Sequence, residues 1–262
     1  MSLDDSSLKE VLEIKTIALT VAFIAMVFIA TAMFSMYLPA STGYFNLGEA
    51  FVYLAALIGG PIVGAIAGGL GSAMADMALG FPAFAPATLV LKGAEGFAAG
   101  FLYRFTKQIS QKIRLLILSI ISIFLVGFPL YISVMEPTVI VADVLEIPSF
   151  VLVVVALILC SLLWYASLFL GEKGQMSLAC VLSGTIIVTG YFFYEILYGI
   201  PPVGALAEVP FNILQVLFGT FIAVPVISYL HDIGIIPEPG NLVPWQSETV
   251  KQAERQPVPR EL

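Results

Sequence analysis

Residues 60–79, GPIVGAIAGGLGSAMADMAL, form an apolar run with the length of a membrane-spanning helix. An α-helix rises 1.5 Å per residue, so about 20 residues cross the hydrocarbon core of a bilayer. Within this run Gly60, Gly64 and Gly68 recur every four residues, and Gly71 follows. Small residues at this spacing lie on one helix face and let a neighbouring helix approach closely in lipid. The stretch therefore predicts a membrane helix packed tightly inside a helical bundle.

The composition of the whole chain agrees with this prediction. Of its 262 residues, 60% are hydrophobic and 11% are charged, and the mean hydropathy is +1.02. About a quarter of the residues of a soluble domain are charged, so this composition excludes a water-soluble enzyme and a disordered chain. A net charge of -7 also argues against a nucleic-acid partner, because phosphate binding requires a basic face.

Eight apolar segments predict an all-α integral membrane protein, a helical bundle. They run roughly over residues 14–36, 48–59, 61–79, 86–103, 115–135, 149–171, 177–199 and 208–230. We expect helices because a backbone in lipid must satisfy its hydrogen bonds internally and because the segments lack the alternation of barrel strands. The second and third segments meet at Gly59, Gly60 and Pro61, where we expect a sharp break, since proline lacks an amide donor.

The basic residues indicate the orientation of the bundle. Ten of the eleven Lys and Arg residues lie outside the spans or at their edges. Four connections on the opposite side contain none: 37–47, 80–85, 136–148 and 200–207. By the positive-inside rule, eight spans then place both termini in the cytoplasm of a multi-pass cell-membrane protein. We expect a membrane domain over 1–236 and a flexible, polar cytoplasmic tail over 237–262.

Polar side chains inside the spans are the candidates for a binding site, because a charge there costs about 2.5–3.5 kcal/mol on insertion scales. They are Glu49, Asp76, Lys92, Glu95, Glu195, Asn212 and Gln215. Their depth along the helices places all of them in the outer half of the membrane. This distribution predicts a pocket that opens to the exterior and is closed below. Because carboxyl groups outnumber the lysine, the pocket suits a cation or a neutral ligand rich in hydrogen-bond donors.

The same residues also have structural interpretations. Lys92 and Glu95 lie three residues apart on one helix face and could pair with each other. The tyrosines around Glu195 could form an aromatic belt at the membrane interface. Glu49 and Glu208 could be solvated at that interface. The glycine ridges could serve internal packing alone.

Several catalytic patterns are absent from the sequence. It contains no Walker-type glycine loop and no HExxH motif, and its one histidine, His231, leaves no Ser-His-Asp or Cys-His set. The two cysteines, Cys160 and Cys180, lie inside apolar runs. We expect no enzyme activity, no cofactor and no metal site.

Five stretches, taken in order, resemble the substrate-binding S components of energy-coupling factor (ECF) vitamin transporters, most closely the riboflavin-type group. They are GYFNLGEA (43–50), GGPIVG (59–64), GSAMAD (71–76), APATLVLKGAEG (85–96) and EVPFNILQ (208–215). The resemblance covers about residues 15–104 and 177–230.

The resemblance implies a six-helix core with an outward-facing pocket that captures a vitamin, with riboflavin the leading candidate. It implies a membrane T component, which contacts an Ala-xxx-Ala patch matched here by Ala18 and Ala22, and two cytoplasmic ATPase subunits. The S component is thought to topple in the membrane to release its vitamin inside. Phe45, Phe84 and Tyr194 would add stacking surfaces to the polar candidates, with Asn46 beside them. Metal-ion S components use an N-terminal histidine that this chain lacks, so cobalt and nickel are disfavoured.

The sequence departs from this family in its number of segments. A helix pair at about 113–172 would be inserted between core regions 14–104 and 177–230, and a pair leaves both termini on the same side. Two other functions stay open. One is a stand-alone proton-coupled secondary transporter with Glu95 or Glu195 as the relay. The other is a non-catalytic membrane partner subunit.

Overall fold

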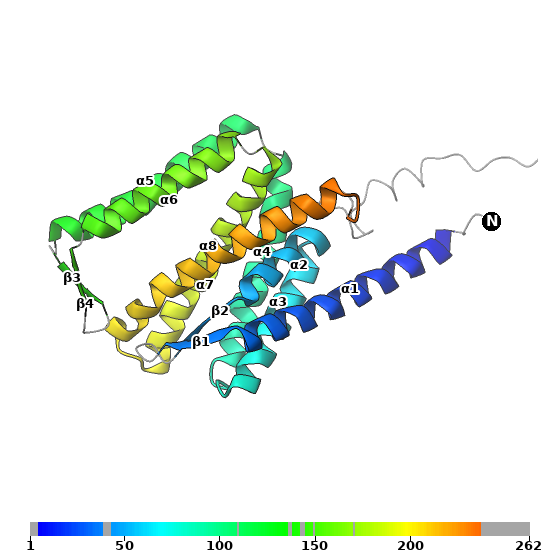
Figure 1. Cartoon of the computed structure of the whole chain (residues 1–262), viewed down its shortest axis with the longest axis horizontal. Helices are drawn as coiled ribbons and strands as arrows, with labels where there is room; N and C mark the ends of the chain where they lie inside the picture. Colours follow the sequence, from blue (N-terminus) through cyan, green and yellow to red (C-terminus); the bar gives the residue numbers. More distant parts are fainter. Residues whose placement is uncertain are drawn as a thin grey trace, which may run out of the picture.

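The computed structural model describes residues 5–38, 43–108, 110–135, 138–141, 145–148, 150–169 and 171–236. The predicted tail, 237–262, lies outside the described residues. The helices are α1 (Asp5–Met33), α2 (Gly48–Gly59), α3 (Pro61–Leu79), α4 (Ala85–Gln108), α5 (Gln111–Met135), α6 (Phe150–Phe169), α7 (Glu172–Tyr198) and α8 (Pro202–Asp232) (Figure 1). The strands are β1 (Ser35–Leu38), β2 (Gly43–Asn46), β3 (Thr138–Val141) and β4 (Leu145–Pro148).

Glycines allow α3 to pack closely on both α4 and α1. A Cβ atom added at Gly96 of α4 would lie 2.2 Å from the carbonyl oxygen of Gly64 in α3. A Cβ atom added at Gly71 would lie 2.8 Å from the carbonyl oxygen of Ile24 in α1. Such distances leave no room for a side chain, so the glycine spacing read from the sequence is a helix-packing surface.

The break between α2 and α3 falls where the sequence predicts it. Gly60 has φ +88°, a conformation that glycine adopts at little cost, and Pro61 is the first residue of α3. The amide of Gly60 donates to the carbonyl of Ala56 and ends α2. Nearly every residue of α2 is buried, with Tyr53 and Leu57 fully enclosed. This short helix is therefore the centre of the bundle.

Two hairpins occupy regions that we expected to be helix or loop. We predicted that the first span reaches residue 36, but α1 ends at Met33 and β1 pairs antiparallel with β2, with Tyr37 opposite Tyr44. In the same way β3 pairs with β4 inside 136–148. Short runs of aromatic and β-branched residues favour strands, and such runs are hard to separate from helix ends by hydropathy alone.

Four helices in the described part of the chain are long and apolar enough to cross a membrane. They span Glu13–Met33, Pro61–Leu79, Glu172–Tyr198 and Gly204–Asp232. Large apolar side chains such as Ile17, Phe221 and Leu197 lie exposed on their outer faces, as expected for surfaces in contact with lipid. The chain is thus a helical membrane protein, while the number of eight spans stays a prediction.

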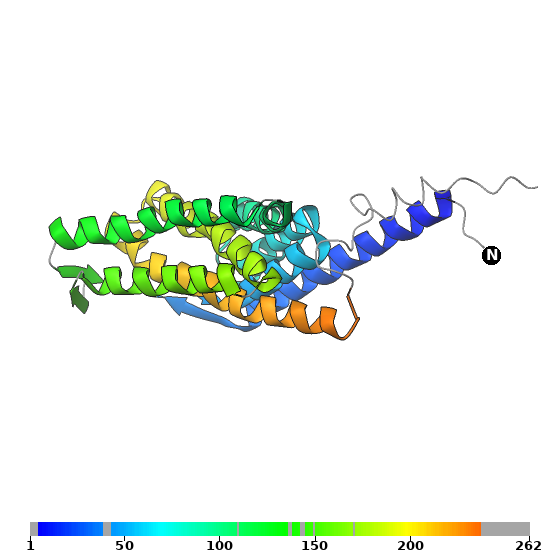
Figure 2. The same cartoon turned by 90° about the horizontal axis from the view of Figure 1, so that it is seen from above.

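Helices α5 and α6 form a hairpin of their own. They pack against each other, and α6 also packs against α7. In Figure 1 this hairpin lies to one side of α7 and α8, with the β3–β4 hairpin at its tip, and in Figure 2, seen from above, it overlaps them. The polar residues described next lie away from it.

Candidate functional site

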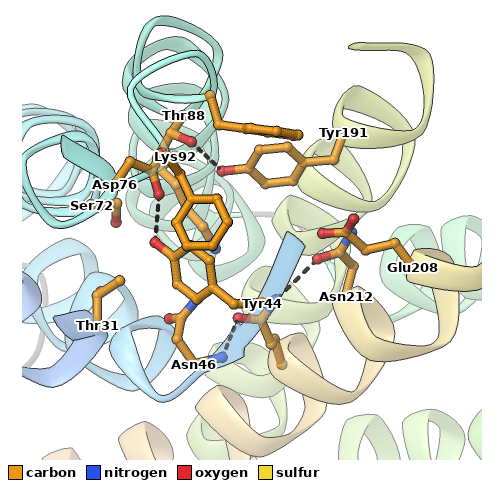
Figure 3. Close-up of a pocket in the computed structure, with 13 residues that line it drawn as sticks. Thr31, Tyr44, Asn46, Ser72, Asp76, Thr88, Lys92, Tyr191, Glu208 and Asn212 are labelled. Atoms are coloured by element: carbon orange, nitrogen blue, oxygen red, sulfur yellow. Dashed lines mark hydrogen bonds between the residues drawn. The ribbon is translucent and has the colours of Figure 1, made fainter. Parts of the chain in front are cut away.

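A polar pocket lies at the end of the bundle that carries the β1–β2 hairpin (Figure 3). It is lined by Thr31, Tyr44, Asn46, Ser72, Asp76, Phe81, Phe84, Thr88, Lys92, Tyr191, Glu208, Asn212 and Gln215. These residues come from α1, β2, α3, α4, α7, α8 and the α3–α4 connection. The enclosed space is about 30 Å³, which holds only a few water molecules. The pocket is therefore closed in this structure.

The β1–β2 hairpin closes the pocket through hydrogen bonds to two helices. The Tyr44 hydroxyl donates to Asp76 Oδ1 of α3 at 2.5 Å. The backbone amide of Asn46 donates to Gln215 Oε1 of α8 at 3.0 Å. The side-chain amide of Gln215 in turn donates through Nε2 to Asn212 Oδ1 at 3.0 Å. The bonds of Tyr44 and Asn46 each join residues far apart in the sequence, so they fix the hairpin over the pocket.

Two further observations define the chemistry of β2. Burial, followed by the neighbouring charge of Asp76, raises the pKa of the Tyr44 hydroxyl above its ordinary value. Tyr44 therefore stays protonated and acts as a donor. The Asn46 side chain accepts a hydrogen bond from the Gly48 amide at 2.9 Å, so its oxygen is already used at the start of α2.

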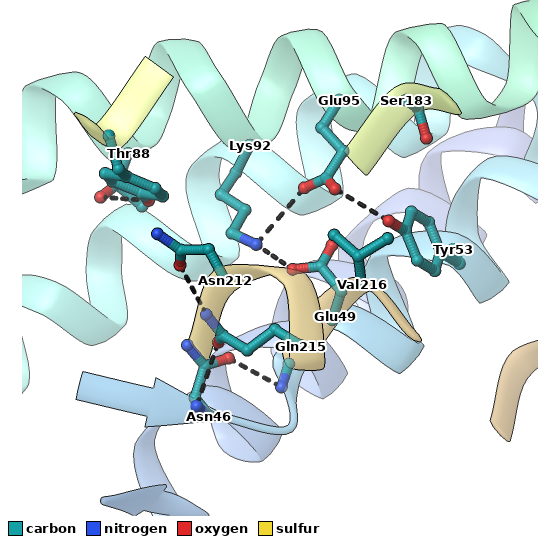
Figure 4. Close-up of polar contacts among 12 residues, drawn as sticks. Asn46, Glu49, Tyr53, Thr88, Lys92, Glu95, Ser183, Asn212, Gln215 and Val216 are labelled. Atoms are coloured by element: carbon teal, nitrogen blue, oxygen red, sulfur yellow. Dashed lines mark hydrogen bonds and ion pairs between the residues drawn. The ribbon is translucent and has the colours of Figure 1, made fainter. Parts of the chain in front are cut away.

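A buried charge cluster lies beside the pocket (Figure 4). The Lys92 ammonium donates to Glu49 of α2, and also to Glu95 Oε2 of its own helix at 3.3 Å. The Tyr53 hydroxyl donates to Glu95 Oε1 at 2.9 Å. Lys92, Glu49 and Glu95 are 4%, 1% and 0% exposed. The pairing of Lys92 with Glu95 is confirmed, and the interpretation of Glu49 as a solvated residue is wrong, because α8 packs over it.

The tyrosines of α7 bond to α4 and to the connection before it. The Tyr191 hydroxyl donates to Thr88 Oγ1 at 2.9 Å, and the Tyr194 hydroxyl donates to the carbonyl of Ala83. The rings of Tyr194 and Phe84 meet edge to face, with centroids 5.5 Å apart. These contacts join α7 to the start of α4, so these two tyrosines do more than mark a membrane interface.

Glu195 and Glu208 are a second pair of acidic residues at this end. Glu195 is fully buried, and neither of its carboxyl oxygens has a hydrogen-bond partner among the described residues. Glu208 is 7% exposed and lines the pocket. The interpretation of Glu208 as a solvated interfacial residue is therefore wrong.

The structure sorts the predicted site residues into two groups. Those that line the pocket are Asn46, Asp76, Phe84, Lys92, Asn212 and Gln215. Those outside the lining are Glu49, Glu95, Tyr194 and Glu195, which bond to or pack behind it. The side chain of Phe45 lies outside the described residues. That these groups bind a ligand stays a prediction.

Sequence reasoning missed several lining residues. They are Thr31, Tyr44, Ser72, Phe81, Thr88, Tyr191 and Glu208. Hydroxyl side chains are common in membrane helices because they can bond to their own backbone, so threonine or serine in a span gives little signal. Tyr44 could have been found, since it lies within the 43–50 stretch quoted above.

The two alanines of the predicted partner surface lie on the outside of α1. Ala18 and Ala22 are both exposed, as is Ala25 one turn further on. They are not buried by any of the described residues, and they form a strip of small side chains on the α1 surface.

Comparison with known proteins gives two matches. The family model of the ECF-type riboflavin transporter, S component, matches residues 11–164, which include α2, α3, α4, α5 and most of α6. A protein of Pyrococcus woesei described as "Uncharacterized protein in gap 3'region" is 44% identical over 78 residues. That match covers 30% of this chain and 52% of the relative, so the chain spans about half the length of this relative. Because the family match covers more than half of this chain, the chain belongs to the ECF-type riboflavin transporter S component family.

Proposed function

We propose that this chain is the substrate-binding subunit of an ATP-driven ECF importer and that it captures riboflavin from outside the cell. Family membership supports the class of function. The closed polar pocket is the observation that carries the assignment of the site. A T component and two cytoplasmic ATPases would supply the energy for release inside.

The chemistry of the pocket favours a neutral ligand with hydroxyl groups and an aromatic ring. Lys92 offsets only one of the two carboxyl groups that it contacts, Glu49 and Glu95. With Asp76 and Glu208 in the lining as well, carboxyl groups are in excess around the pocket. Carboxylates accept hydrogen bonds from ligand hydroxyls and repel phosphate. The aromatic side chains of the lining offer rings for stacking. Riboflavin has these features, and its phosphorylated form adds the charge that the pocket disfavours.

Loading must involve movement of the β1–β2 hairpin. Sites for small molecules usually enclose about 300–1,000 Å³, whereas the pocket here encloses about 30 Å³. The bonds from Tyr44 to Asp76 and from Asn46 to Gln215 hold the hairpin closed. Opening it would break both bonds and free the Asp76 and Gln215 side chains for the ligand.

The proposed topology follows from the charge asymmetry of the sequence. Eight spans would place both termini in the cytoplasm and the β1–β2 hairpin outside. The membrane domain (1–236) would consist of a six-helix core (14–104 and 177–230) and an inserted pair (about 113–172), followed by the cytoplasmic tail (237–262). The α5–α6 hairpin packs on α7, which supports a distinct pair, whereas the family match over residues 11–164 runs through α5 and most of α6. The exposed Ala18 and Ala22 would receive the T component.

The experiment is to purify the chain alone and to identify co-purified small molecules by mass spectrometry and visible absorbance. Stoichiometric riboflavin would support the proposal. A protein that is empty and binds no member of a vitamin panel at low micromolar concentration would contradict it. Cellular uptake that continues without ATP and stops when the proton gradient collapses would instead support the secondary transporter. A chain that neither binds nor transports would be a partner subunit.

A further inference from the structure

A second, larger hollow lies between α6, α7 and α8. This groove encloses about 600 Å³ and shares no lining residue with the polar pocket. Leu162 and Tyr165 of α6 form one wall, and Ile213, Leu217 and Phe221 of α8 form the other. Its volume lies within the range of small-molecule sites. The α5–α6 hairpin seen beside the bundle in Figure 1 thus borders a cavity large enough for a ligand.

The floor of the groove presents hydrocarbon even where its residues carry hydroxyl groups. Besides Tyr165, the groove is lined by four aliphatic hydroxyl side chains: Ser177, Thr185, Thr189 and Thr220. Each donates at 2.7–2.8 Å to a backbone carbonyl three or four residues earlier in its own helix. Because these hydroxyl groups already donate to backbone carbonyls, the threonines present to the groove only methyl groups and oxygens whose hydrogen atoms are bonded elsewhere. The floor is suited to an alkyl chain.

One end of the groove carries a positive charge. Lys173, the second residue of α7, lines the groove and is exposed. Its neighbour Glu172 is paired with Lys107 at 2.9 Å and accepts from the Tyr103 hydroxyl. Among the described residues Lys173 has no ion-pair partner. The amino terminus of α7 adds partial positive charge at the same place, so this end attracts an anion.

The length of the groove fits a lipid chain below its headgroup. From Lys173 to Thr189, α7 rises about 24 Å, which exceeds the roughly 15 Å depth of one leaflet of the hydrocarbon core. Both α7 and α8 are apolar enough to cross the membrane. We propose that the groove binds one anionic phospholipid, with an acyl chain between α6 and α8 and its phosphate on Lys173. This proposal does not depend on the vitamin assignment.

The headgroup assignment is tested by native mass spectrometry of the full chain in detergent, titrated with dioleoyl phosphatidylglycerol or dioleoyl phosphatidylcholine. We expect one phosphatidylglycerol per chain, held about fivefold more tightly than phosphatidylcholine, as one lysine near an anionic headgroup provides. Lys173→Gln should abolish this preference. Lys112→Gln is the matched control, because Lys112 is an exposed lysine at the start of α5 outside the groove lining. Equal binding of both lipids, or the same loss in both variants, would overturn the proposal.

The position of the acyl chain is tested by filling the groove. Thr185→Trp places a large ring in it and should reduce lipid binding at least tenfold. Leu197→Trp puts the same ring on the most exposed part of α7, outside the groove, and should leave binding unchanged. Circular dichroism checks that both variants are folded. Lipid binding unaffected by Thr185→Trp would refute the proposal. Displacement of the lipid by riboflavin would also refute it. So would a dimer of the chain that Thr185→Trp dissociates, because the groove would then be a contact between two copies.

Discussion

The buried charge cluster gives the sharpest test of the packing described above. Replacing Lys92 with Met keeps the length of the side chain but removes the charge that lies between Glu49 and Glu95. All three side chains are at most 4% exposed, so water cannot replace the lost partner. The variant leaves two buried carboxylates next to each other.

The size of the effect follows from the geometry and from the cost of protonation. At 3.3 Å the attraction between Lys92 and Glu95 is about 5 kcal/mol with an effective dielectric constant of 20. The variant can escape the repulsion if a carboxyl group takes up a proton, which costs an ordinary glutamate about 3.7 kcal/mol at pH 7. Breaking a buried pair usually costs about 3–5 kcal/mol. We therefore expect Lys92→Met to lower the free energy of unfolding by about 4 kcal/mol at pH 7.

The loss should depend on pH with a defined sign. In the variant, the folded state holds a proton that the unfolded chain lacks at pH 7, so its stability rises as the pH falls. At pH 5 the uptake of that proton costs only about 1 kcal/mol. The deficit relative to the wild type should therefore shrink to about 1–2 kcal/mol.

The assay is unfolding by SDS in mixed micelles, followed by far-ultraviolet circular dichroism at pH 7 and pH 5. The triple variant Glu49→Gln/Lys92→Met/Glu95→Gln carries no charge in the cluster and should recover most of the loss. Lys107→Met, which breaks a partly exposed ion pair with Glu172, should cost less than about 1 kcal/mol. The reasoning is refuted if Lys92→Met costs under 1 kcal/mol at pH 7, if the loss is equal at both pH values, or if the triple variant is no more stable.

Three other predictions follow from single contacts. Gly96→Ala should destabilise the protein by about 1–3 kcal/mol or prevent folding, because the new Cβ meets a backbone oxygen. Gly93→Ala, whose Cβ would lie 3.4 Å from its nearest neighbour, should be tolerated. Equal melting temperatures of the two variants would contradict this packing. Tyr44→Phe removes a bond that holds the hairpin closed, so stopped-flow riboflavin fluorescence should show faster binding, and an unchanged rate would argue against a hairpin gate. The double variant Ala18→Leu/Ala22→Leu should bind riboflavin normally but fail to co-purify with the T component; retained co-purification would place that interface elsewhere.

Some features could be predicted from the sequence because their causes are local. The break at Gly60 and Pro61 depends on the backbone properties of two adjacent residues. The spacing of Gly64 and Gly68 requires a close helix neighbour, although not α4 in particular. The pairing of Lys92 with Glu95 follows from helix geometry. In each case the residues that decide the structure are within four positions of each other.

Other features depend on contacts between distant parts of the chain. Glu49 joins Lys92 across 43 positions, and nothing near Glu49 in the sequence shows that α8 covers it. The β1–β2 hairpin follows directly after α1, so its apolar residues extended the predicted span. Tyr194 was expected in the site, but its hydroxyl bonds to the backbone before α4. Such partners become visible only when the helices are assembled.

The most direct test of the proposed function is an equilibrium titration of the purified chain with riboflavin, followed by quenching of the vitamin's fluorescence. We predict one riboflavin per chain, weaker binding of riboflavin phosphate, and a loss of about tenfold or more in the Asn212→Ala and Gln215→Ala variants, each of which removes a buried polar group of the pocket. Thr185→Trp, in the separate groove, should bind like the wild type. The account would be contradicted if the chain did not bind riboflavin. It would also be contradicted if Asn212→Ala and Gln215→Ala left riboflavin binding unchanged while Thr185→Trp weakened it.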